Sequence, residues 1–156
     1  MRPFPIICIC ILFTLPAAAF GAGTSGTYSA NGKNAVLAHV LAIKGKPFAD
    51  KPTTTLVFSE KDASGDKNPA FDATMGNFGA ALVVRLVQDA NGWKVIGSEF
   101  AHPALQHSGA SSIGVVNAVD MKLANGELSG RIASVTDADL FHEPLNIDVK
   151  FSVAQP

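Results

Sequence analysis

Four side chains late in the chain have the chemistry of a metal site. His102, His107, His142 and Glu143 supply three imidazoles and one carboxylate, and neutral imidazole is both a common metal ligand and a common acid–base group. Their spacings match neither the i, i+4 pair nor the two-residue spacing of familiar zinc motifs. Because all four fall in predicted loops, we expect solvated polar residues and no cofactor. A divalent metal held by these four residues is the alternative.

A second group of oxygen-bearing side chains lies between positions 62 and 72. Its members have the ligand type that calcium prefers: Asp62, Ser64, Asp66, Asn68 and Asp72. An EF-hand loop, however, has its glycine at the sixth position and ends in a bidentate glutamate. Gly65 occupies the fourth position here, and no glutamate closes the loop. The sequence therefore favours a polar turn over a calcium site.

Motifs of covalent catalysis are missing. Residues 109–114 place serines beside glycines but do not match the Gly-x-Ser-x-Gly elbow of hydrolases. Cys8 and Cys10 are the only cysteines, and both precede the predicted mature chain, which then has no thiol nucleophile. Neither a phosphate-binding loop nor a dinucleotide fingerprint is found. These features favour a non-catalytic protein, although they do not exclude an enzyme.

Residues 1–22 have the layout of a secretory signal peptide. Arg2 is followed by a nearly continuous apolar run over 6–15 and by small residues over 17–22. A run of about ten apolar residues is shorter than the roughly 20 that a transmembrane helix needs. We predict that residues 1–22 are removed and that residues 23–156 form one β domain. The mature chain would be periplasmic or extracellular and free of disulfides.

The charge of the chain excludes two classes of partner. It has 12 basic and 13 acidic residues, and its lysines and arginines are too scattered to form the basic face that nucleic acids or anionic membranes require. Residues 23–156 also contain no apolar run long enough to anchor the chain in a membrane. We therefore predict no nucleic-acid partner and no membrane anchor after cleavage.

Alternation of apolar and polar residues indicates the strands that would position these groups. Near the C-terminus, Ile147, Val149 and Phe151 alternate with polar residues, as in a half-buried strand. Asn-Gly pairs at 31–32, 91–92 and 125–126 supply the positive φ angles of tight hairpins. About eight strands are predicted: 27–30, 35–44, 53–60, 80–89, 93–100, 112–123, 127–135 and 146–153.

This spacing predicts an all-β fold, an antiparallel β-sandwich, with a small closed β-barrel as the alternative. Strands 35–44 and 80–89 are apolar on both sides, which indicates that their second face is also covered. A single short helix is predicted near 69–75. Asn68 would cap it, Pro69 would begin it and Gly76 would end it. Phe71 and Met75 would share one side of it.

Three residues within the predicted strands invite a structural interpretation. His39 alternates with Leu37 and Leu41, which predicts a core or boundary histidine. Arg85 interrupts an apolar strand, so its charge needs an ion-pair partner. Trp93 follows an Asn-Gly turn, and we expect it to cover one end of the core.

Three hypotheses of function follow. The first is a non-catalytic binding module of the bacterial envelope or secretome, whose partner is another exported macromolecule that pairs with an edge strand. The second is a carrier of a small apolar ligand inside a β-barrel. The third is a metal-handling protein or metal-dependent enzyme that uses the loop histidines.

Overall fold

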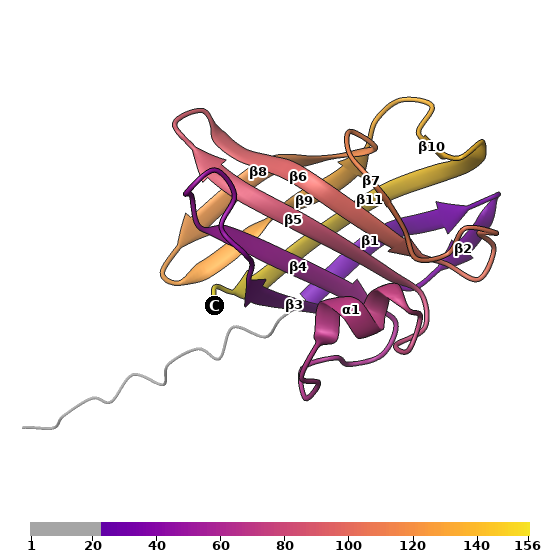
Figure 1. Cartoon of the computed structure of the whole chain (residues 1–156), viewed down its shortest axis with the longest axis horizontal. Helices are drawn as coiled ribbons and strands as arrows, with labels where there is room; N and C mark the ends of the chain where they lie inside the picture. Colours follow the sequence, from indigo (N-terminus) through magenta and orange to yellow (C-terminus); the bar gives the residue numbers. More distant parts are fainter. Residues whose placement is uncertain (1–22) are drawn as a thin grey trace, which may run out of the picture.

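The computed structural model describes residues 23–156, so the predicted signal peptide at 1–22 lies outside the described residues. Two antiparallel sheets face each other and do not close into a barrel (Figure 1). The β-sandwich prediction is confirmed, and the barrel alternative is wrong. The space between the sheets is filled by buried apolar side chains, so no barrel interior is left to enclose a ligand.

The first sheet contains both ends of the described chain. Its strand order is β2-β1-β11-β9-β8, and the short β10 pairs with β11 in addition. The strands are β1 (Gly23–Ala30), β2 (Lys33–Ala35), β8 (Val116–Ala124), β9 (Glu127–Ser134), β10 (Asp139–Leu140) and β11 (Glu143–Ala154).

The second sheet is an uninterrupted meander, β3-β4-β5-β6-β7. Its strands are β3 (His39–Lys44), β4 (Thr53–Ser59), β5 (Ala81–Asp89), β6 (Gly92–Ala101) and β7 (Ala110–Ser112). The one helix of the described residues, α1 (Pro69–Thr74), lies on the outer face of this sheet (Figure 1).

Two predicted strands are each divided between the two sheets. Within the predicted strand 35–44, β2 ends at Ala35 and β3 begins at His39. Within the predicted strand 112–123, β7 ends at Ser112 and β8 begins at Val116. The break shifts the buried face of β3 to Val40 and Ala42. His39 is therefore exposed, and its prediction as a core or boundary residue is wrong.

All three Asn-Gly pairs form hairpins, but with two kinds of turn. Asn31-Gly32 and Asn125-Gly126 have positive φ at both residues, as a two-residue type I′ turn requires. In the third hairpin only Gly92 has a positive φ, of 108°. The carboxylate of Asp89 accepts a hydrogen bond of 2.8 Å from the Asn91 amide, which stabilises a different turn than expected.

Apolar side chains from both sheets form the main core. Phe58 of β4 packs edge-on against Phe151 of β11 at 5.4 Å between ring centroids, and thereby links the sheets. Trp93 is partly buried and packs against this cluster, so the prediction that it packs on the core is confirmed.

The second apolar face of the central strands is covered by α1. Val57 of β4 and Val83 of β5 form a small outer cluster with the buried Ala73 of the helix. This cluster explains why residues 80–89 are apolar on both sides.

The described residues contain no helix of the length and apolar character that crossing a bilayer demands.

The predicted helix boundaries are close to those observed. Pro69 is the first helical residue and Gly76, with φ 78°, follows the last turn. Asn68 occupies the N-cap without a side-chain capping bond, and its amide donates to Asp66 Oδ1 at 2.6 Å. Phe71 and Met75 line the same groove, so they do share one side of the helix.

Candidate functional site

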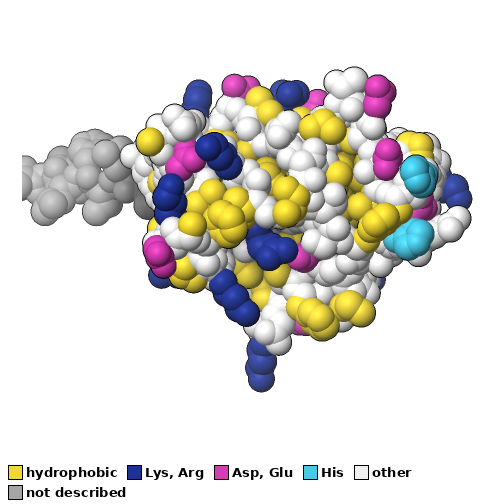
Figure 2. All heavy atoms as spheres, turned by 45° about the horizontal axis from the view of Figure 1, so that its top comes forward, with side chains coloured by type: hydrophobic (Ala, Val, Ile, Leu, Met, Phe, Trp, Pro, Cys, Tyr) yellow, Lys and Arg dark blue, Asp and Glu magenta, His cyan; other side chains and the backbone are white. Residues whose placement is uncertain are grey.

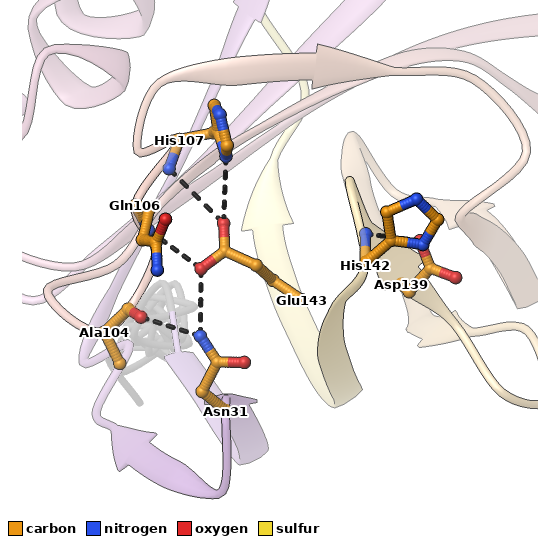
Figure 3. Close-up of polar contacts among 7 residues, drawn as sticks. All are labelled: Asn31, Ala104, Gln106, His107, Asp139, His142 and Glu143. Atoms are coloured by element: carbon orange, nitrogen blue, oxygen red, sulfur yellow. Dashed lines mark hydrogen bonds and ion pairs between the residues drawn. The ribbon is translucent and has the colours of Figure 1, made fainter.

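Glu143, the first residue of β11, is the centre of a polar cluster between three segments. Its Oε1 accepts hydrogen bonds from Asn31 Nδ2 at 3.0 Å and from the Gln106 amide at 2.9 Å. Its Oε2 accepts from the His107 amide and faces His107 Nδ1, both at 3.3 Å (Figure 3). The carboxylate therefore joins the β1–β2 turn and the loop after β6 to β11.

These donors determine the charge state of the cluster. The Gln106 amide, followed by Asn31 and His107, lowers the pKa of Glu143 from 4.5 to about 2 against the opposing effect of burial. Asn31 strengthens the same junction, because its Nδ2 also donates to the Ala104 carbonyl at 2.8 Å. The carboxylate is ionised at neutral pH and both of its oxygens have partners, so it acts as a structural anchor.

His102 is buried, not solvated as expected from its loop position. It is 2% exposed, and its ring meets Tyr28 edge-on at 5.1 Å. Nδ1 accepts the Ala104 amide at 3.0 Å, and a backbone hydrogen bond with Lys33 partly opposes the effect of burial on the pKa of the ring. Burial lowers the pKa of His102, which makes the neutral imidazole the form present at physiological pH.

The four residues proposed for a metal site do not come together as a set. His107 contacts Glu143, whereas His142 lies on the other side of the β11 end, beside Asp139, whose Oδ1 accepts the His142 amide at 3.2 Å (Figure 3). Within residues 23–156, no group of three or more His, Cys, Asp or Glu side chains is placed to hold a metal ion.

The acidic loop uses its oxygens in local turns. The carboxylate of Asp62 accepts the amide of Ser64 at 2.9 Å and its hydroxyl at 3.0 Å. The amide and then the hydroxyl of Ser64 lower the pKa of Asp62. Together with the bond between Asp66 and the Asn68 amide, this arrangement is that of the polar turn expected from the sequence.

The turn before Glu143 has an unfavourable backbone. Phe141 and His142 have φ angles of 55° and 68°, and they connect the paired residues Leu140 and Glu143. Left-handed φ costs a residue with a β-carbon roughly 1 kcal/mol or more, and type I′ turns favour Asn-Gly. The partly exposed Phe141 ring lies 5.2 Å from that of His107.

Relief of this turn is a testable expectation. The double variant Phe141→Asn, His142→Gly should raise the free energy of unfolding by about 1–2 kcal/mol, because both new residues tolerate positive φ. Urea denaturation measures the difference. Phe141→Ala, His142→Ala is the control, since it shortens the same side chains but keeps both β-carbons. Equal stability of the two double variants would show that the turn is not strained.

An apolar groove on the outer face of the five-stranded sheet was not predicted from the sequence. It has a volume of about 800 Å³, and Val83 and Ile96 of the central strands are among the residues that line it. Phe71 of α1 and Met75, which directly follows that helix, line it, as does Phe48 from the β3–β4 connection. Their exposed fractions are 65%, 61% and 53% respectively. In Figure 2, hydrophobic side chains gather on this side of the molecule around a basic and an acidic side chain.

Arg85 and Glu99 form the ion pair in this groove, as predicted for Arg85. Arg85 Nη2 lies 2.9 Å from Glu99 Oε1, and Glu99 Oε2 accepts the Thr74 hydroxyl at 2.9 Å. A register shift follows Arg85, which pairs with Gly97, while Leu86 pairs with Val95. Such a bulge redirects neighbouring side chains. The missing side chain of Gly97 leaves room for the guanidinium above β6.

The sequence signals for the groove were partial. The spacing of Phe71 and Met75 on one side of the helix and the charge of Arg85 within an apolar strand were visible. Phe48 carried no signal, because a lone aromatic residue in a loop does not show what it faces.

Comparison with known proteins adds nothing to this geometry: no family model matches the chain, and neither a curated protein nor a solved structure matches it.

Proposed function

We propose that the mature chain is an exported, non-catalytic binding module that takes up an extended segment of another exported protein along the open edge of β3. The observation that supports this most is the length and regularity of that edge. β3 pairs with β4 in unbroken register over six residues, and no other strand within residues 23–156 pairs with it.

The other sheet edges carry features that discourage pairing. β2 and β7 have only three residues each. β8 is interrupted by a register shift between Val119 and Lys122, where Asp120 has a φ of 51°. The open part of β1 contains Gly26 with a φ of 131°. Natural sheets protect their edges with short strands, bulges and charges. Of these features β3 has only the charge of Lys44 at its end, so we expect its edge to accept a partner strand.

The hydrogen-bonding groups of β3 that face outward follow from its register. The Gly45 amide donates to the Thr53 carbonyl at 2.9 Å, in continuation of the β3–β4 ladder. Because successive residues of an antiparallel strand point their amide and carbonyl to opposite sides, those of Val40, Ala42 and Lys44 face the open edge. They form a regular row of donors and acceptors for an incoming strand.

A groove of about 480 Å³ runs beside this edge. It is bounded by residues 39–42 of β3 on one side, by residues 153–156 at the C-terminus on the other, and by Asp62 and Ser64. Its walls combine apolar and polar side chains, so it offers space for the side chains of an added strand. In strand addition, the backbone bonds supply affinity and such flanking pockets supply specificity.

The variant Lys44→Pro tests this proposal. Proline removes an amide that faces the open edge without removing a bond to β4, so the protein should keep its fold. Lys44→Ala is the matched control, because it loses the same side chain but keeps the amide. Random dodecapeptides displayed on phage are selected on the wild type. We expect Lys44→Pro to weaken the selected peptides by about tenfold and Lys44→Ala to leave them unchanged.

Amide hydrogen exchange identifies the mode of binding. A bound peptide should slow exchange at Val40, Ala42 and Lys44 and leave the amides of β8 unchanged. Peptides that bind Lys44→Pro as well as the wild type, or that protect no amide of β3, would refute strand addition at this edge.

A further inference from the structure

We infer that the groove between α1 and the β3–β4 connection binds a small amphipathic carboxylate, with its apolar tail between Phe48 and Met75 and its carboxylate on Arg85. Within β3 the groove is lined by Ile43 alone, and the inference does not depend on the function proposed for the open edge of that strand. Its ligand class follows from the walls of the groove, from the free donors of Arg85 and from the charges around them.

The walls require an apolar tail. Phe48, Phe71 and Met75 are three of the large apolar side chains that the protein exposes, and all three line the same groove. An exposed apolar cluster of this kind usually marks a binding site. The groove volume of about 800 Å³ lies within the range of roughly 300–1,000 Å³ typical of small-molecule sites.

Arg85 supplies the recognition of the head group. Its side chain is about half exposed, at 47%, and its one hydrogen bond within residues 23–156 joins Nη2 to Glu99. Nε and Nη1 are left without a partner among these residues. The guanidinium lies over Gly97, whose added β-carbon would come within 3.2–3.4 Å of three guanidinium atoms. A planar guanidinium with free donors is suited to bidentate binding of a carboxylate.

The charge of the lining selects an anion. Lys46 and Arg85 carry positive charges, and Glu99 carries the one negative charge of the groove lining. Both oxygens of Glu99 already accept hydrogen bonds, from Arg85 and Thr74. A cationic head group would therefore meet net positive charge, whereas a carboxylate is attracted to it.

Decanoate is the probe for this site, with decyltrimethylammonium as a cation of equal tail length. Titration calorimetry should show saturable 1:1 binding of decanoate and none of the cation. Phe48→Ser and Met75→Ser should each weaken decanoate about tenfold through loss of apolar contact. Arg85→Lys, which keeps the charge but loses the planar guanidinium that binds a carboxylate with two hydrogen bonds, should weaken decanoate binding by a similar factor.

Two control variants show whether decanoate binds in this groove and nowhere else. Ile113→Ser removes an apolar side chain that is 77% exposed and lies outside the groove, so decanoate binding should not change. Lys44→Pro should likewise bind decanoate normally, which distinguishes a failure at β3 from a failure at the groove. Thermal melts establish that each variant is folded.

Three outcomes of the binding measurements would overturn the inference. They are the absence of saturable binding, equal binding of the anion and the cation, and an Ile113→Ser defect as large as that of Phe48→Ser. A wild-type dimer that Phe48→Ser converts to monomer would also overturn it, because the groove would then be covered by a second copy of the chain.

Discussion

Replacing Phe58 by alanine is expected to lower the free energy of unfolding by about 3–5 kcal/mol. Phe58 is fully buried in β4, and its ring packs against Phe151 of β11 in the opposite sheet. Residues 23–156 contain no cysteine, so apolar contacts across the sandwich hold the sheets together without a disulfide. A loss of this size is a large part of the roughly 5–15 kcal/mol that stabilises a typical domain.

Phe71→Ala provides the matched control for this experiment. It removes the same ring from a mostly exposed position on α1, where we expect a change within about 0.5 kcal/mol. Urea denaturation followed by the fluorescence of Trp93 compares both variants with the wild type. Equal losses for Phe58→Ala and Phe71→Ala would mean that the space between the two sheets is not the stabilising core.

Glu143→Gln is expected to destabilise the protein at pH 7 and to flatten its acid denaturation profile. The amide keeps one acceptor oxygen but loses the negative charge, so the donors from Asn31, Gln106 and His107 are no longer all satisfied. Bonds to a charged acceptor are also stronger than bonds to a neutral one. The variant should therefore have a clearly lower melting temperature than the wild type.

The direction of the pH effect follows from the lowered pKa of Glu143. Between its ordinary value of 4.5 and the folded value of about 2, the unfolded chain binds the proton more readily than the folded chain does. The contribution of Glu143 is thus fully present above about pH 4.5 and is lost as the pH falls through about 2. In Glu143→Gln this group no longer titrates, so the free energy of unfolding no longer falls with decreasing pH on its account.

Stability measured by urea denaturation from pH 2 to pH 7 tests the structural role of this carboxylate. Asn31→Gly removes one donor to the carboxylate while keeping a residue that tolerates the φ of 50° at that position. Its free energy of unfolding should fall with decreasing pH less steeply than that of the wild type and more steeply than that of Glu143→Gln. Asp139→Asn, which affects a single bond to the His142 amide, should lower the free energy of unfolding at pH 7 less than Glu143→Gln does. Identical slopes for the wild type and Glu143→Gln would contradict the role of Glu143 as an anchor.

The hairpins and the helix end were predictable because their signals are local. Asn31-Gly32 and Asn125-Gly126 adopt the positive φ angles that the turn demands, and few other residue pairs do so at low cost. Gly76 ends the helix for the same reason. The alternation over Ile147, Val149 and Phe151 likewise matches their buried side of β11.

The points at which the chain changes sheets were not predictable. Residues 36–38 and 113–115 interrupt segments that read as continuous strands, and most of these interrupting residues are apolar. An apolar residue fits either sheet of a sandwich, so the pattern does not mark the crossing. The error over His39 followed directly, because one misplaced break reverses which residues of a strand face the core.

For the polar cluster around Glu143, the sequence indicated several of the residues but not their roles. The residue types drew attention to His102, His107 and Glu143, but their roles depend on contacts between distant segments. Glu143 meets Asn31 across 112 positions and His107 across 36, and no local pattern records such a contact. The same holds for the groove, whose walls come from α1, the β3–β4 connection and the central strands.

The amino-acid sequence by itself determined the strand-forming pattern, the turns and the short helix, since φ preference and side-chain alternation belong to each residue and its neighbours. Only the tertiary structure decided which strands share a sheet, that the Glu143 carboxylate is saturated by donors, and that Phe48, Phe71 and Arg85 line one groove. Those outcomes depend on the packing of segments far apart in the chain, where burial and charge are set by neighbours that the linear order does not reveal.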